Sequence, residues 1–255
     1  MLQKMKKIVF IIIFLSITYF TFGQKLVDST KTLSLIAHYS FDFPALDMKD
    51  RYGNNNGVGA ELSYKTSKNV LFALNYTYLF GNNIKIEDSI FKGISTSDGF
   101  IIDQNGMYAE VFCYERGFSI IAKAGYQFQL PTKYYSGIQL MGGGGFLQHK
   151  IRIENRENVA PQILGDYAKG YDYLRNGPAG YLYLGYVFHA NQKIIKFTAG
   201  FDCLFAFTQS RRDYLFPIHG PDKGTHFDMI YGFKFGWIID LYKSNKTENK
   251  KYYFN

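Results

Sequence analysis

The strongest constraint on the fold of this chain is the alternation of large apolar side chains in its last regular segment. Every second residue from Phe227 to Leu241 is apolar or aromatic, whereas most of the residues between them are polar or glycine. Successive side chains of a β-strand point to opposite faces of the sheet. The pattern therefore predicts a strand with two chemically different faces, and the open question is what surrounds the apolar one.

The same alternation recurs along the chain and predicts seven further strands. We expect them at Thr32–Asp42, Gly57–Thr66, Val70–Phe80, Phe118–Phe128, Ile138 to about Ile153, Gly180–Phe188 and Ile195–Thr208. Long links at 43–56, 81–117, 154–179 and 209–225 alternate with short links at 67–69, 131–137 and 189–193. This rhythm is typical of an up-and-down β-barrel with short periplasmic turns and long outer loops.

The apolar face of these strands is predicted to contact lipid. Aromatic residues make up 18% of the chain, and no amphipathic helix of useful length is available to cover them. In lipid a sheet must close on itself to satisfy its backbone hydrogen bonds. We therefore expect an all-β fold, an antiparallel transmembrane barrel of eight strands. Its lipid-facing residues include Phe197, Phe201, Phe205, Phe233, Phe235 and Trp237.

The opposite face of the strands is polar or small and is predicted to line the lumen. A barrel of eight strands is just wide enough for side chains to fill its interior. We expect a network of ion pairs and hydrogen bonds there, and an ion or proton path is the alternative. The charged members of this network are Asp42, Glu61, Lys65, Lys123, Lys196, Asp202, Asp228 and Lys234.

The first 23 residues have the features of an export signal. Lys4, Lys6 and Lys7 precede an apolar run that ends near Phe22, and we expect cleavage between Gly23 and Gln24. A single membrane anchor is the alternative. Residues 24–242 would then form the barrel, and residues 243–255 a basic periplasmic tail. The tail could complete an assembly signal with its terminal aromatics, bind a periplasmic partner, or remain a solvated end.

The segment from Met107 to Glu115 tests the strand count. Asn105-Gly106 is a strong hairpin signal, so this segment could be a further strand. Counting it as a membrane crossing would place the long link at 154–179 on the periplasmic side. We therefore favour a small hairpin that stands above the membrane, inside the second long loop.

Charge and cysteine content exclude two classes of protein. The formal net charge of +8 includes three lysines of the signal, and the tail contributes +3, so the barrel segment carries only +2. Such a balance does not favour nucleic acid as a partner. Cys113 and Cys203 are the only cysteines, so no disulfide framework is expected.

Function is expected to lie in the long loops, the tail or the outer wall. The third and fourth loops could contact glycolipid phosphates or a partner protein; a rim that is merely solvated is the alternative. A rim enzyme would need a nucleophile and a base, for which Ser210 and His219 are the least implausible pair, but no catalytic, metal or nucleotide motif is present. We expect no enzymatic activity and no cofactor. The contact candidates are Arg156, Tyr167, Lys169, Tyr171, Tyr173, Arg175, Arg211 and Arg212.

The chain resembles the outer-membrane β-barrel proteins of Bacteroidota-type bacteria. The resemblance rests on Phe22-Gly23-Gln24, on the eight alternating strands, and on the segments GGGFLQHKIRIEN, GDYAKGYDYLRNG and FTQSRRDY. These segments are similar to one uncharacterised, eight-stranded group. The resemblance implies an integral outer-membrane protein, and some such barrels are accessory subunits of export or motility machinery. A rim enzyme acting on lipid or glycolipid and a narrow small-solute channel are the alternatives.

Overall fold

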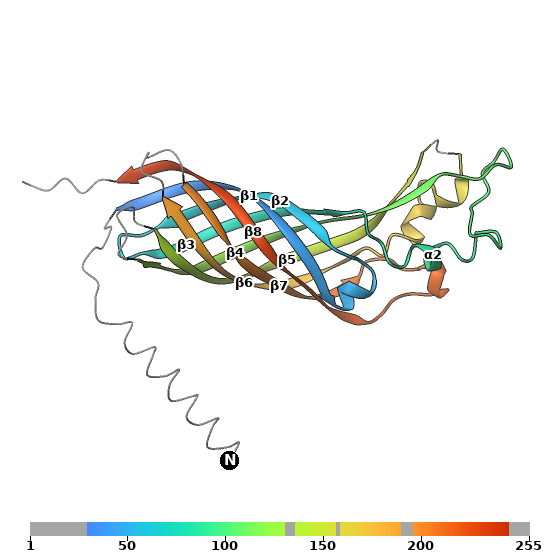
Figure 1. The fold of residues 1–255 in the computed structure, drawn as a ribbon. Helices are drawn as coiled ribbons and strands as arrows, with labels where there is room; N and C mark the ends of the chain where they lie inside the picture. Colours follow the sequence, from blue (N-terminus) through green and yellow to red (C-terminus); the bar gives the residue numbers. More distant parts are fainter. Residues whose placement is uncertain (1–29, 131–135, 157–158, 190–195, 245–255) are drawn as a thin grey trace, which may run out of the picture.

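A computed structural model of the chain describes residues 30–130, 136–156, 159–189 and 196–244. These residues form a single closed barrel of eight antiparallel strands (Figure 1). All eight predicted strands are present, and the predicted up-and-down order is confirmed. The strands are β1 (Lys31–Leu46), β2 (Asn55–Lys65), β3 (Val70–Gly81), β4 (Val111–Gln129), β5 (Gly137–Asn155), β6 (Arg175–His189), β7 (Lys196–Ser210) and β8 (Thr225–Ser244).

Each strand pairs with the next in sequence, and β1 closes the ring by pairing with β8. Ala37 lies opposite Trp237 at this seam, and Trp237 lies opposite Phe197 of β7 on its other side. The tight turn between β2 and β3 is present, with Asn69 at a φ of 62° and a hydrogen bond from its amide to the Thr66 carbonyl. The other two predicted short turns fall mainly on 131–135 and 190–195, outside the described residues. The predicted signal and most of the tail also lie outside them.

The long links gather at one end of the barrel, where they form what we call the cap. It contains short helices: η1 (Asp47–Asp50), α2 (Glu87–Ile90), η2 (Pro161–Ile163), η3 (Tyr167–Gly170) and η4 (Phe216–Ile218). The interior of the cap is apolar, with Met48, Ile90 and Ile163 almost fully buried in a cluster that continues into the barrel. Among the described residues, no helix is long and apolar enough to cross a membrane.

The side-chain pattern of β5 changes where the strand enters the cap. In its first half, Ile138 and Leu140 point outward and are exposed. Beyond Phe146 the pattern inverts: Leu147 and Ile151 are fully buried, and the residues between and after them that face outward are polar. Apolar-in and polar-out is the arrangement of a barrel in water. The predicted span of Ile138 to about Ile153 is confirmed to within two residues at each end, and the second half of the strand belongs to the cap.

The segment from Met107 to Glu115 differs in part from the prediction. The small hairpin exists, with an antiparallel bridge between Ile102 and Tyr108. Val111 to Glu115, however, is the beginning of β4 and pairs with β5. This segment adds no further crossing, so the count of eight holds. The reason is the same as in β5, since the paired strands continue beyond the apolar wall into the cap.

Candidate functional site

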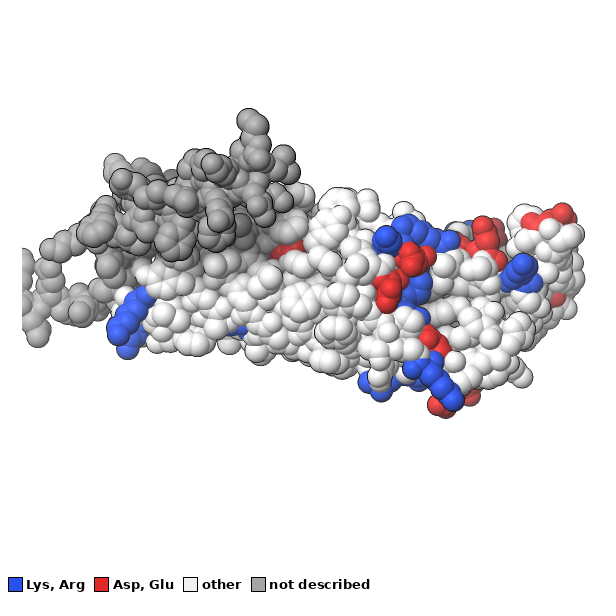
Figure 2. All heavy atoms as spheres, turned by 90° about the horizontal axis from the view of Figure 1, so that it is seen from below, with Lys and Arg blue, Asp and Glu red and all other residues white. Residues whose placement is uncertain are grey.

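The outer wall of the barrel is an exposed apolar surface. Phe201, Phe233 and Trp237 are 43%, 52% and 49% exposed, and Phe197 and Phe235 are exposed beside them, whereas Phe205 is half-buried. On the face shown in Figure 2, charged side chains gather over the cap, and most of the described wall carries none. Apolar patches on soluble monomers rarely exceed a few hundred Å². The wall is therefore suited to contact with lipid.

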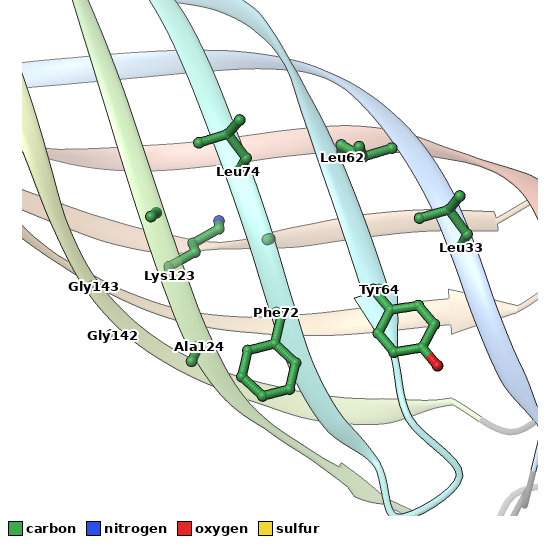
Figure 3. Close-up of a pocket in the computed structure, with 11 residues that line it drawn as sticks. Leu33, Leu62, Tyr64, Phe72, Leu74, Lys123, Ala124, Gly142 and Gly143 are labelled. Atoms are coloured by element: carbon green, nitrogen blue, oxygen red, sulfur yellow. The ribbon is translucent and has the colours of Figure 1, made fainter.

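The wall carries a shallow groove between β2 and β5 (Figure 3). The groove has a volume of about 520 Å³ and lies where Ala122, Ala124 and Gly142 leave space beside the larger Leu74 and Phe72. Lys123, on β4, also lines the groove, but its amine points into the barrel, where it pairs with Glu61. The groove is thus a hollow in an apolar surface without a polar group directed into it.

Ion pairs between strands fill the middle of the barrel: one joins β4 to β2 across the lumen and the other joins the neighbouring strands β8 and β7. Lys123 Nζ lies 2.7 Å from Glu61 Oε2, and Lys234 Nζ lies 2.9 Å from Asp202 Oδ2. All four side chains are buried. Asp42 is also buried and accepts a hydrogen bond of 2.7 Å from Ser40. A buried ion pair needs further hydrogen bonds to offset its desolvation.

Two tyrosines that the sequence analysis did not single out contact these ion pairs, Tyr181 through hydrogen bonds and both through their rings. The Tyr181 hydroxyl donates to Asp202 at 2.8 Å and accepts from Lys234 at 2.7 Å. The Lys123 amine lies 5.0 Å from the Tyr181 ring centre and 5.1 Å from that of Tyr183. The alternation in β6 could have revealed both tyrosines, because Leu182 and Leu184 point outward and leave Tyr181 and Tyr183 pointing inward.

The interior is closely filled at this level. The cavity among Ser40, Asp42, Thr77 and Lys234 measures about 20 Å³, space for about one water molecule. Towards the other end, Lys196 pairs with Asp240, and Lys65 is half-buried. The barrel therefore encloses a polar, ion-paired core in place of an open channel at its middle.

A second buried network closes the barrel where it meets the cap. Asp228 is fully buried and lies 3.2 Å from Arg51 Nη2 and 2.9 Å from His149 Nε2. It also accepts a hydrogen bond from Thr208. The Tyr52 hydroxyl lies 3.2 Å from the other ring nitrogen of His149. We expected Asp228 to pair with a lysine; its partners are instead Arg51, from the first long link, and His149.

Beside this network, Arg175 lies in a chain of buried and half-buried charges. Its guanidinium lies 2.6 Å from Asp222, and Asp222 is hydrogen-bonded to His226 at 3.0 Å. Burial acts to raise the pKa of Asp222, but the hydrogen bonds with His226 and Arg175 outweigh it and hold this pKa below its usual value. The prediction that Arg175 is a surface contact residue needs correction, because the structure buries it.

The other contact candidates fall into two groups. Tyr171 is also buried and packs against Phe91 and Phe216. The prediction that it is a surface contact residue is therefore wrong as well. The remaining side chains are exposed or half-buried on the cap, and most have an internal partner. Arg156 pairs with Glu110, Lys169 with Asp166, Arg212 with Asp172 and Arg211 with Asn176, while Tyr167 is 63% exposed and Tyr173 is half-buried.

The cap does not assemble the rim residues into a hydrolytic site. Ser210 Oγ accepts a hydrogen bond from the Arg212 amide at 3.3 Å, and His219 is exposed at a left-handed turn. No hydrogen bond joins these two residues in the described part of the chain. His226 and His149 are each bonded to a carboxylate that an arginine also contacts. Within the described ranges, no group of three or more His, Cys, Asp or Glu could hold a metal ion.

Comparison with known proteins gives likeness of shape only. No family model matches the chain, and no curated protein matches it. Among solved structures, Ail, the attachment invasion locus protein of Yersinia pestis, is 8% identical, with a TM-score of 0.41 over 82% of this chain and 98% of that one. The N-terminal β-barrel domain of Pseudomonas aeruginosa OprF is 11% identical, with a TM-score of 0.36 over 82% and 99%.

A further likeness is to the outer membrane protein OprG of Pseudomonas aeruginosa. It is 13% identical, with a TM-score of 0.33 over 82% of this chain and 97% of that one. We draw no functional conclusion from likenesses of this degree.

Proposed function

We propose that this chain is an integral outer-membrane β-barrel of a Gram-negative bacterium, of the Bacteroidota type that its sequence resembles. We further propose that it acts without catalysis, through contacts of its cap and wall with lipid, glycolipid or an envelope protein. The observation that carries the proposal is the inverted barrel: exposed aromatics outside and buried ion pairs inside. In water this distribution would be unstable, whereas in a bilayer both faces are in suitable surroundings.

The cap supports a role through contacts. Its interior is apolar, Tyr167 is presented by the short helix η3 and Arg156 follows β5, and the network around Asp228 holds the cap against the barrel. A rigid cap offers a surface that needs little ordering when a partner binds. Such a barrel would serve as an accessory or structural subunit of an envelope assembly, with export or motility machinery as candidates. The filled lumen argues against the alternative of a small-solute channel.

The proposed orientation places the cap outside the cell. Single cysteines introduced at Met107, a 67% exposed residue of the cap, and at Lys68, in the β2–β3 turn, test it. In intact cells a membrane-impermeant maleimide should label Met107→Cys, and should label Lys68→Cys only after lysis. The parent chain measures the background from Cys113 and Cys203. Labelling of Lys68→Cys alone in intact cells would reverse the orientation.

The proposed contact role is tested by purification of the tagged chain from native outer membrane in mild detergent. We expect a stoichiometric envelope protein to co-elute. A variant that changes the exposed Arg156 and Tyr167 to alanine, with the barrel left intact, should reduce its yield. A barrel that elutes alone, with or without bound glycolipid, would contradict the subunit role and leave lipid contact as the remaining role.

A further inference from the structure

The cap contains a groove that is separate from the lumen. It lies between α2 with the residues that follow it and the start of β4, at the end of the molecule where α2 is labelled in Figure 1. Its volume is about 1110 Å³. The Ile102–Tyr108 bridge forms part of the same region of the cap. None of the ion-paired residues of the lumen or of the network around Asp228 lines it, so the role of the groove is independent of the packing of the barrel.

Exposed aromatic side chains form one wall of the groove. Phe100 and Tyr108 are 49% and 59% exposed, and their rings stack with centres 4.7 Å apart at 28°. Phe112, which also lines the groove, is 42% exposed. These rings stand in the cap, beyond the wall that faces lipid. Exposed apolar groups rimmed by polar residues are typical of interaction sites.

The charges around the groove are mainly negative. Glu87, Asp88 and Asp98 line it and form no ion pair with any residue of the described ranges. Glu110 also lines it and pairs with Arg156, and Lys92 is the single basic residue in its lining. Partial burial and the neighbouring Asp88 raise the pKa of Glu87. A positive charge placed between these carboxylates would relieve their mutual repulsion. Because the whole chain is formally +8, this negative region is local.

We propose that this groove binds a basic peptide segment through a guanidinium or ammonium group. An arginine side chain can stack on an aromatic face and bond carboxylates in the same position, a combination that few other groups provide. The charge of the groove disfavours sulfated sugars and lipid phosphates. The proposal rests on the proposed function in one respect, that the cap faces outside and can meet such a segment on a partner protein.

The test uses the full chain purified in detergent and a fluorescein-labelled peptide of alternating arginine and tyrosine. Binding should be measurable by fluorescence anisotropy and should weaken as salt is raised, because exposed charges are screened. A matched peptide with citrulline in place of arginine keeps the shape without the charge, and it should bind more weakly. Equal binding of the two peptides would overturn the proposal, as would displacement of the arginine peptide by a neutral oligosaccharide.

Variants locate the binding in the groove. The double change Asp88→Asn with Asp98→Asn should weaken binding about fivefold, the scale of one or two exposed ion pairs. Phe100→Ala should weaken it about threefold. The control changes Asp166→Asn with Asp213→Asn, and Tyr214→Ala, remove exposed groups of the same kinds from other cap loops and should leave binding unchanged. Equal losses in the controls would place binding elsewhere. Because this assay is done in detergent, its failure is distinguishable from a wrong orientation, which only the maleimide labelling reports.

Discussion

Phe233 lies midway along β8 with its side chain on the outside of the barrel, 52% exposed. The change Phe233→Lys would place a charge at the middle of the proposed bilayer, where lysine costs about 2–4 kcal/mol. We expect a large fall in folded protein in the outer membrane, measured by fractionation and by the gel mobility of unheated samples. Phe233→Leu is the control and should assemble normally. Normal levels of Phe233→Lys would show that this face does not contact lipid.

Asp228 is the residue on which the junction of barrel and cap depends. Arg51 already has two nitrogens without a hydrogen-bond partner in the described part of the chain, so Asp228→Asn would leave its buried charge uncompensated. Breaking a buried ion pair on one side costs about 3–5 kcal/mol. We expect lower resistance to thermal unfolding and faster hydrogen exchange in the cap. Asp166→Asn, which breaks the exposed pair with Lys169, is the control and should leave thermal unfolding almost unchanged.

Residues of this junction show where prediction from sequence ends. Alternation predicts that Asp228 points inward, because the side chains of a strand have a fixed period. Alternation does not predict that Arg51 is its partner, because Arg51 lies in an irregular link 177 residues away and meets Asp228 only when the barrel closes. His149 could have been placed inside from the inverted pattern of β5, and Arg175 could not, since it is the first residue of its strand.

At the scale of the strand, the four glycines from Gly142 to Gly145 are not equivalent. A Cβ at Gly145 would lie 1.9 Å from the Ile120 carbonyl oxygen, whereas one at Gly142 would meet Leu182 at 3.5 Å, an ordinary contact. Gly145→Ala should therefore disturb the pairing of β4 with β5, at a cost of about 1–3 kcal/mol. Gly142→Ala is the same change in the same strand and should be tolerated. Thermal unfolding of the two variants measures the difference, and equal stability would contradict this account of the strand.

The strands were predictable because each is long and strongly alternating, and their ends were not. The predicted start of β4 at Phe118 is the point where the apolar wall ends, while the strand itself begins at Val111. In the cap the same backbone pairing continues; β5 there has the opposite polarity, whereas in β4 Phe112 still points outward and Glu115 is buried. In β5 the change of phase therefore marks the level at which the strand leaves the apolar wall and enters the cap.

At the scale of the whole molecule, the account depends on one distribution: apolar side chains outside the barrel, ion pairs inside it, and a cap with an apolar interior. The ring closure follows from the pairing of β1 with β8. The ion pairs and tyrosines of the interior then fill the space that eight strands enclose. This explains why the outer wall and the cap, in place of the lumen, are the surfaces left for function.

The single tryptophan of the chain, Trp237, tests this distribution most directly, since it stands on the outer wall with 49% of its surface exposed. The measurement is its fluorescence in the refolded protein, reconstituted in vesicles of phospholipid brominated along the acyl chains. The account predicts blue-shifted emission that is strongly quenched relative to unbrominated vesicles and little affected by aqueous iodide. Emission quenched by iodide and unaffected by bromine would show that the wall faces water, and it would contradict the proposed membrane barrel.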